Sequence, residues 1–405
     1  MNLEQAKEKL EKFGQMQVLK YFDDLTADEK EKLLNEIEKT DFSVIRKGDD
    51  CFKDCFITPM GAMCLPEIEK KKAELEEKGL EAIRKGKLSL VLLAGGQGTR
   101  LGIDGPKGTF KIGLTKDLYI FQCLINNLLE VKEKAGVWIP LAIMTSDINN
   151  KATVAFFEEH DYFGYNKDEV YFFIQEMAPA TDYDGKVYME SKSHIALSPN
   201  GNGGWFKSMQ NAGLVDKMKA KGAEWINIFS VDNVLQRMAD PVFFGAALEA
   251  GVDVGSKVIA KAAPDEKVGV MCYRNGKPSI VEYYELTPEM MSSREENGDL
   301  SYNYGVTLNY IFKISALEKI AERNLPLHVV EKKIPHLDEN GNPVKPEAPN
   351  GHKYEGLVLD MIEMMDSCLA FEVDRAKEFA PVKNMHGVDS ADSAREMLKA
   401  NGVEL

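Results

Sequence analysis

The sequence has few cysteines, no long apolar run and no excess of basic residues. Only six of its 405 residues are cysteines, too few for a disulfide-stabilised miniprotein and typical of reduced thiols in the cytoplasm. No stretch reaches the roughly 18 consecutive apolar residues that a membrane-spanning helix needs. The charged N-terminal segment MNLEQAKEKLEKFGQMQVL also lacks the apolar core of a signal peptide. These absences predict a cytoplasmic protein that does not associate with membranes.

The charge balance argues against nucleic acid as a partner. The formal net charge is −15, a sign that repels nucleic acid and anionic lipid alike. A polyanionic ligand must therefore meet a local cluster of basic residues. The 44% hydrophobic and 28% charged fractions are those of an ordinary globular protein, and 405 residues suffice for two or three domains.

The cysteines offer one incomplete metal motif. Cys51, Cys55 and Cys64 could supply three zinc ligands. A structural zinc normally takes four, and neither a fourth cysteine nor a histidine lies nearby in the sequence. Free buried thiols are the simpler interpretation.

The chain is predicted to have three parts. Residues 1–86 form a helical region, because apolar residues recur at spacings of three and four among Glu and Lys, and Thr26 with Glu29 matches a capping box. Residues 87–330 form the main α/β domain, and residues 331–405, which begin with an irregular proline-rich stretch, form a small C-terminal domain.

The main domain is predicted to contain a mixed, mostly parallel sheet flanked by helices. An apolar run at 88–95, a helical segment at 118–136 and another apolar run at 138–146 have the order of a βαβ unit. Asn275–Gly276 between two β-rich runs indicates a hairpin. The expected architecture is α/β, a Rossmann-like fold. Further strands are expected at 170–175, 224–233 and 254–262.

A glycine-rich loop follows the first apolar run. The segment LAGGQGTRLG (93–102) precedes GPKG (105–108), and small residues at such a place let backbone N–H groups approach a phosphate. The spacing fits neither a dinucleotide fingerprint nor a Walker loop, which disfavours a nicotinamide oxidoreductase. Arg100 and Lys107 could both reach a triphosphate; the alternative is a tight turn with two solvated cations.

These motifs resemble those of a known family. The two glycine segments are similar to the signature of the UDP-sugar pyrophosphorylases, and closest to their UDP-N-acetylglucosamine pyrophosphorylase branch. The similarity continues in the same order to residue 384, through QEMAPA (175–180), DGK (184–186), SPNGNGG (198–204), VDN (231–233), DP (240–241), GV (269–270), VEY (281–283), KKIP (332–335), PNG (349–351) and FAPVKN (379–384). The resemblance implies a nucleotidyltransferase fold and a magnesium-dependent uridylyltransferase.

The implied reaction joins UTP to a sugar 1-phosphate and releases pyrophosphate. Such a transfer needs in-line positioning and stabilisation of negative charge, and no covalent nucleophile. The resemblance implies that Arg100, Lys107 and Lys383 contact the UTP phosphates as the catalytic cations. Without it, Lys383 would be taken as a surface lysine. No histidine is assigned to the site, because a phosphate monoester oxygen is already ionised near neutral pH.

Asp232 is the expected metal ligand. It follows an apolar strand, so its carboxylate would lie at the edge of the sheet where open α/β folds bind ligands. Mg²⁺ takes one or two protein carboxylates together with phosphate oxygens and water. The family match favours the metal over the alternative of a turn or helix cap.

The resemblance also implies a set of nucleotide contacts. Gln175 would read the uracil edge, because a side-chain amide offers both a donor and an acceptor. Backbone groups of Ala94, Gly95 and Gly96 would complete base and ribose recognition, and Gly201 would contact the nucleotide. A plain Asn-Gly turn is the alternative at 200–204.

The implied sugar contacts are Asn202, Gly269, Glu282 and Tyr283. Glu282 can accept hydrogen bonds from two hydroxyls, while Gly269 leaves room for the ring. The family usually has asparagine after the glycine of NYGVTLN (303–309), whereas this chain has Val306, with Asn303 or Asn309 as possible substitutes. The expected substrate is N-acetylglucosamine 1-phosphate. Alternatives are the glucose, galactose or N-acetylgalactosamine 1-phosphates and, in another class, a non-catalytic nucleotide-sugar binding protein.

Overall fold

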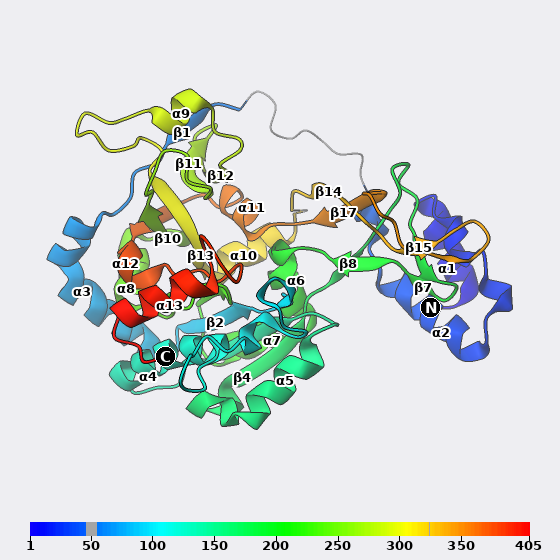
Figure 1. The fold of residues 1–405 in the computed structure, drawn as a ribbon, viewed down its shortest axis with the longest axis horizontal. Helices are drawn as coiled ribbons and strands as arrows, with labels where there is room; N and C mark the ends of the chain where they lie inside the picture. Colours follow the sequence, from blue (N-terminus) through cyan, green and yellow to red (C-terminus); the bar gives the residue numbers. More distant parts are fainter. Residues whose placement is uncertain (46–54, 324) are drawn as a thin grey trace. The chain divides into compact units, whose positions relative to one another are not determined.

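The computed structural model describes residues 1–45, 55–323 and 325–405 (Figure 1). Contacts divide the chain into two compact units, each assembled from separate stretches. The described residues of the smaller unit are 1–45, 175–204 and 325–358, and those of the larger unit are 55–174, 205–323 and 359–405. The predicted borders after residues 86 and 330 do not coincide with these borders, because the chain leaves the larger unit at 175 and again at 325.

Two amphipathic helices begin the smaller unit. They are α1 (Leu3–Lys12) and α2 (Ala27–Lys39), and each starts with a capping box. The predicted box is present: Thr26 N donates to Glu29 Oε2 at 2.9 Å, and Glu29 N donates to Thr26 Oγ1 at 3.4 Å. Leu10 and Leu33 are buried while the charged residues face solvent. Short strand pairs complete the unit: β5 (Met177–Pro179) with β8 (Leu197–Pro199), β6 (Met189–Ser191) with β7 (His194–Ile195), β14 (His328–Lys332) with β17 (Gly351–Glu355), and β15 (His336–Leu337) with β16 (Pro343–Val344).

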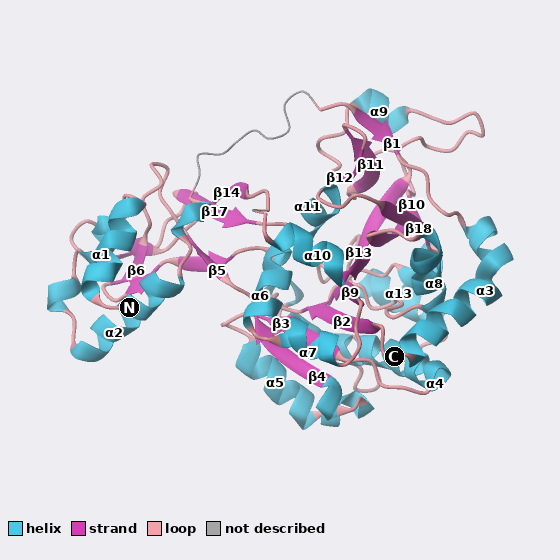
Figure 2. Cartoon of the chain, turned by 180° about the vertical axis from the view of Figure 1, so that it is seen from behind, coloured by secondary structure: helices cyan, strands magenta, loops and turns pink. Residues whose placement is uncertain are grey.

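The larger unit is built on a ten-stranded mixed sheet, which confirms the predicted α/β class. Its parallel part has the order β9 (Trp225–Ser230), β2 (Leu88–Leu93), β3 (Leu141–Thr145) and β4 (Val170–Ile174). These strands are mostly apolar because helices cover the sheet; α5, for example, packs beside β4 (Figure 2). The strands beyond β9 are β13 (Tyr304–Lys313), β11 (Val270–Arg274), β1 (Ile57–Pro59), β12 (Lys277–Val281), β10 (Val254–Ala260) and β18 (Cys368–Glu372).

The larger unit has two long helices, α3 with 20 residues and α4 with 16, and both lie in segments whose apolar spacing predicts a helix. The described helices are α3 (Leu65–Arg84), α4 (Ile120–Ala135), α5 (Asn150–Glu159), α6 (Trp205–Asn211), α7 (Leu214–Ala220), α8 (Pro241–Ala250), α9 (Pro288–Ser292), α10 (Ile314–Ala321), α12 (Arg375–Glu378) and α13 (Ala391–Ala400). α11 (Val358–Glu363) begins at the border of the smaller unit. No helix in the described part of the chain is both long and apolar enough to cross a membrane.

The predicted hairpin is confirmed. β11 and β12 pair antiparallel, and the two turn residues Asn275 and Gly276 have φ values of +50° and +77°. Positive φ at both positions is what a type I′ turn requires, and asparagine and glycine are the residues that adopt it most readily.

The C-terminal stretch does not form a separate compact unit. Residues 331–358 belong to the smaller unit, while 359–405 belong to the larger one. β18 pairs in parallel with β10, with Val254 opposite Cys368 and Val258 opposite Glu372. The last part of the chain therefore completes the central sheet.

Candidate active site

The glycine loop after β2 closes on itself. Lys107 N donates to Gly96 O at 3.1 Å, and Gly98 N donates to Gly105 O at 2.8 Å. These two bonds bring residues 105–107 back beside 96–98, so the two glycine segments of the sequence form one structure. Lys107 starts the short 3₁₀ helix Lys107–Thr109 and is buried.

Lys107 and Asp232 form an ion pair at the carboxyl edge of the parallel strands. Lys107 Nζ lies 2.6 Å from Asp232 Oδ1. β2 and β9 are parallel neighbours, so the loop after one and Asp232 after the other necessarily meet at the same edge. Lys107 is only 6% exposed, whereas the Asp232 side chain keeps 36% of its surface exposed. A buried cation and a partly open carboxylate thus stand together at the expected ligand-binding edge.

The segment that carries Lys383 is fixed to the loop after β9. Val382 N donates to Asp232 O at 2.8 Å, which places Lys383 one residue from a direct backbone contact with Asp232. Asn233, only 2% exposed, holds the same segment through its side chain: its Oδ1 accepts from Ala380 N at 2.8 Å, and its Nδ2 donates to Glu378 O at 2.7 Å. The structure therefore brings Lys383, which lies 276 residues after Lys107 in the sequence, to the loop that carries Asp232. Lys383 Nζ pairs with Asp389 at 2.9 Å.

A buried ionic group lies at the base of this segment. Lys257 is 1% exposed, and its Nζ lies 2.8 Å from Asp240 and 2.7 Å from Glu378. Burial alone would lower the pKa of the Lys257 ammonium, but the two carboxylates outweigh it and raise that pKa, so Lys257 stays protonated. Burial also raises the pKa of Glu378. Because Glu378 O accepts from Asn233, the ionic group and the amide anchor the same turn.

Arg100, the third predicted phosphate-binding cation, is exposed, unlike Lys107. Arg100 lies in the 3₁₀ helix Thr99–Leu101 of the glycine loop and is exposed to solvent. Ala94, Gly95 and Gly96 lie at the start of this loop. Their carbonyl groups contact Ser146 and Asn149, two residues that the sequence analysis did not single out. No motif marks them; the only signal is their position directly after β3.

Three residues predicted or suspected to contact the sugar lie together. A Cβ placed on Gly269 would be 3.4 Å from Glu282 Oε1 and 3.5 Å from Val306 Cγ2, and Val306 N donates to Gly269 O at 2.9 Å. Tyr283 follows Glu282 directly after β12. Gly269, Glu282 and Val306 thus share one small area, and Val306 presents only methyl groups to it.

Asn303 and Asn309, which could supply the amide that Val306 lacks, already form hydrogen bonds within the protein. Asn309 is 1% exposed; its Oδ1 accepts from Asn227 Nδ2 at 2.8 Å, and its Nδ2 donates to Arg237 O at 3.1 Å. Asn303 Oδ1 accepts from Lys261 N at 3.2 Å. Asn309 is therefore a packing residue of the sheet.

The other predicted ligands belong to the smaller unit. Gln175 follows β4 and is 7% exposed. Gly201 has a φ of +84°, and a Cβ there would lie 2.2 Å from Gly356 O, so glycine is required for the close approach of two backbones. Asn202 Oδ1 accepts from Val358 N at 2.9 Å. Gly201 and Asn202 thus have structural roles in their own unit besides any ligand contact.

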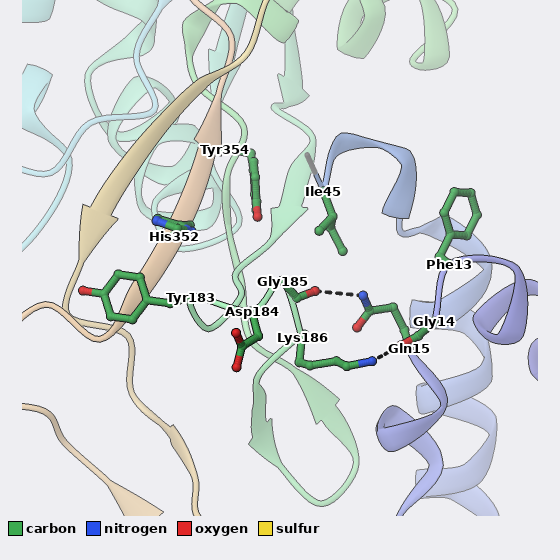
Figure 3. A pocket seen from close by; sticks show the side chains of 10 residues that line it. All are labelled: Phe13, Gly14, Gln15, Ile45, Tyr183, Asp184, Gly185, Lys186, His352 and Tyr354. Atoms are coloured by element: carbon green, nitrogen blue, oxygen red, sulfur yellow. Dashed lines mark hydrogen bonds between the residues drawn. The ribbon is translucent and has the colours of Figure 1, made fainter. Parts of the chain in front are cut away.

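The smaller unit also has a pocket of about 390 Å³ (Figure 3). Two hydrogen bonds join residues of its lining: Gln15 Nε2 donates to Gly185 O at 2.9 Å, and Lys186 Nζ donates to Gly14 O at 2.7 Å. The pocket contains the DGK motif (184–186) but no residue of the predicted site. The lining residues are Phe13, Gly14, Gln15, Ile45, Tyr183, Asp184, Gly185, Lys186, His352 and Tyr354.

No group of three His, Cys, Asp or Glu side chains within the described ranges could hold a metal ion by itself. Cys51, one member of the suspected zinc motif, lies outside the described residues. Cys55 and Cys64 are free thiols, and Cys64 Sγ lies 3.1 Å from the Tyr304 hydroxyl. A metal at Asp232 would therefore take most of its ligands from substrate and water, which suits Mg²⁺.

A glycine-rich, cationic loop at the carboxyl edge of a parallel sheet is typical of α/β proteins that bind phosphorylated ligands. The chain belongs to the UTP--glucose-1-phosphate uridylyltransferase family, whose sequence model matches residues 58–401. It is 35% identical over 403 residues to the UDP-N-acetylhexosamine pyrophosphorylase-like protein 1 of Mus musculus, covering 93% of this chain and 79% of that protein. It is also 35% identical over 407 residues to the UDP-N-acetylglucosamine pyrophosphorylase of Saccharomyces cerevisiae, covering 92% and 84%.

A solved structure extends the likeness to the fold. The uridine diphosphate N-acetylglucosamine pyrophosphorylase of Trypanosoma brucei, solved in complex with an inhibitor, superposes with a TM-score of 0.84 at 28% identity, covering 97% of this chain and 83% of that one. The nucleotidyltransferase fold implied by the sequence motifs is confirmed by this similarity.

Proposed function

We propose that the protein is a magnesium-dependent uridylyltransferase that forms UDP-N-acetylglucosamine and pyrophosphate from UTP and N-acetylglucosamine 1-phosphate. The observation that carries the proposal is the 2.6 Å pair of Lys107 and Asp232 beside the glycine loop. This pair joins a phosphate-binding cation to a potential metal ligand. The names of the yeast and T. brucei relatives support the sugar assignment.

In the proposed reaction, an oxygen of the sugar phosphate attacks the α-phosphorus of UTP in line with the leaving group. The new P–O bond forms as the bond between the α-phosphorus and the bridging oxygen breaks, and pyrophosphate leaves with the electron pair. Lys107 would neutralise charge on the phosphates, and Arg100 and Lys383 would approach the same groups. No proton transfer is required, because the attacking oxygen is already ionised.

Asp232 would hold Mg²⁺ through one carboxylate oxygen, and the ion when bound would neutralise charge on the UTP phosphates. The fit rests on the chemistry of the donor: Asp232 offers a partly exposed carboxylate at the strand edge, and a buried lysine stands beside it. The proposal also places the enzyme in the cytoplasm, with UTP, sugar 1-phosphate and pyrophosphate as its ligands and neither nucleic acid nor membrane as a partner.

The direct test is pyrophosphate release from UTP and Mg²⁺ across a panel of sugar 1-phosphates. We expect the highest kcat/KM with N-acetylglucosamine 1-phosphate. Highest activity with glucose, galactose or N-acetylgalactosamine 1-phosphate would replace the sugar and keep the reaction. Binding of UDP-sugars without any turnover would instead indicate a non-catalytic binding protein.

Base choice gives a sharper prediction. UTP is expected to be preferred over CTP and ATP by more than about 100-fold, because a site that pairs with one base edge leaves its polar groups unmatched by another. Gln175→Ala should relax this preference more than it slows UTP turnover. Gln210→Ala, which changes a half-buried glutamine of α6, is the control. Comparable rates with ATP in the wild type would refute both the role of Gln175 and the uridylyl assignment.

The methyl groups of Val306 predict relaxed sugar selection. An amide at this position could bond the hexose, so Val306→Asn is expected to tighten discrimination among N-acetylglucosamine, N-acetylgalactosamine and glucose 1-phosphates by about 5–30-fold in kcat/KM. Val306→Ala, which changes the space without adding a polar group, separates shape from hydrogen bonding. Unchanged ratios in Val306→Asn would show that Val306 only packs against Gly269.

A further inference from the structure

The first residues of the glycine loop are held by hydrogen bonds to their carbonyl groups. Asn149 Nδ2 donates to Ala94 O at 2.9 Å and to Gly96 O at 3.3 Å, and Ser146 Oγ donates to Gly95 O at 3.0 Å. Asn149 and Ser146 are 1% and 3% exposed. Three successive carbonyl groups are thus turned toward one buried pair of side chains.

The orientation of these carbonyl groups fixes the orientation of the N–H groups that follow them. In a trans peptide the C=O of one residue and the N–H of the next point in opposite directions, and no peptide bond in the described chain is cis. The N–H groups of Gly95, Gly96 and Gln97 therefore point away from Asn149 and Ser146. No acceptor for these three N–H groups exists among the described residues, whereas Ala94 N and Gly98 N on either side bond to Met144 O and Gly105 O.

This arrangement leaves a row of backbone donors that protein groups do not use. Gly96 is exposed, and Gly95 and Gln97 are partly exposed, so oxygen atoms of a ligand can reach them. Successive N–H groups of this kind bind anionic or carbonyl oxygens. The row lies in the same loop as Lys107, whose backbone N donates to Gly96 O and so adds a further constraint on the loop.

Helix capping does not account for Asn149. It occupies the N-cap position of α5, yet its side chain makes no cap hydrogen bond to that helix. Its Oδ1 instead accepts from Ser146 N at 2.8 Å, which fixes the amide so that Nδ2 faces the loop. Both polar atoms of the Asn149 amide are therefore used: Oδ1 holds the turn after β3, and Nδ2 holds the glycine loop.

We propose that Asn149, assisted by Ser146, is a positioning residue that presents the N–H groups of residues 95–97 to the oxygen atoms of the nucleotide. This inference rests on the proposed function, because it takes UTP as the ligand of the loop. Asn149 does not itself touch the nucleotide; it acts through the backbone of the loop. Without the Asn149 side chain the peptide groups can rotate, so the three N–H groups no longer point to the same side of the loop.

The test is direct binding of UTP to the full chain, measured by calorimetry, together with steady-state kinetics. Asn149→Ala is expected to weaken UTP binding about 10-fold and Ser146→Ala about 3-fold, since each removes hydrogen bonds that orient the donors. At saturating UTP, the KM for the sugar 1-phosphate should stay within about twofold of wild type. A purely structural residue would lower Tm without this selective change.

Thr153→Val is the matched control. Thr153 lies on α5, is fully buried, and its Oγ1 has no hydrogen-bond partner in the described structure. The variant should bind UTP as wild type does. Equal UTP affinity in Asn149→Ala and wild type would overturn the inference, and if Asn149→Ala does not fold, unchanged affinity in Ser146→Ala would do so. Failure of the wild type to bind UTP would refute the proposed function instead.

Discussion

Replacing Lys107 with alanine is expected to lower kcat/KM at least about 10²-fold. A phosphate-binding cation in a water-poor site contributes roughly 3 kcal/mol to transition-state stabilisation. Lys107 is 6% exposed and its ammonium group lies 2.6 Å from Asp232, so the charge is held in place before any ligand arrives. Steady-state kinetics of pyrophosphate release give the measurement.

One further variant separates the charge of Lys107 from its packing, and another serves as a control. Lys107→Met keeps most of the buried side-chain volume and should lose nearly as much activity as Lys107→Ala. Lys111→Ala is the control, because Lys111 forms an ion pair of the same 2.6 Å length with Asp117 while both side chains are well exposed. A Lys107→Ala enzyme within threefold of wild type would remove Lys107 from the catalytic group.

Asp232→Asn is expected to reduce activity steeply even at saturating UTP and to raise the Mg²⁺ concentration needed for half-maximal rate. The substitution keeps the size and one carbonyl ligand but removes the charge that would attract the ion. It also removes the anion that holds Lys107, so both metal binding and the position of Lys107 should change. Rates measured across a Mg²⁺ titration test this expectation.

The control is the matched exposed pair. Asp117→Asn breaks the ion pair with Lys111, which has the same length but is exposed to water. Exposed ion pairs contribute little, so this variant should leave the Mg²⁺ dependence unchanged. Full turnover of Asp232→Asn with an unaltered Mg²⁺ optimum would mean that the metal is held elsewhere. The double variant Lys107→Met with Asp232→Asn should lose less than the product of the two single losses, because the partners act together.

Features that depend on local periodicity could be predicted from the sequence. The apolar runs became β2, β3, β4, β9 and β10, and the Asn275–Gly276 turn has the expected positive φ values. The loop carrying Lys107 could be placed because a strand end and its glycines lie next to each other in the chain. Asp232 could be placed in the same way, because it comes just after β9.

Contacts between a side chain and a distant backbone could not be predicted in this way. Asn149 and Asn233 each bond to main-chain groups of other segments, and such bonds leave no spacing pattern in one sequence. The division into two units also leaves no local pattern, since each unit is assembled from three stretches of chain. The roles of Gln175, Gly201 and Asn202 toward a ligand stay predictions.

The anchoring of the Lys383 segment also bears on how the protein folds. Lys383 follows β18, the last strand of the chain, which pairs in parallel with β10. Pairing over such a sequence separation carries a large loop-closure cost, so it is expected to form late. During synthesis the glycine loop and Asp232 emerge long before Lys383. We therefore expect catalytic competence to be among the last properties that the folding chain acquires.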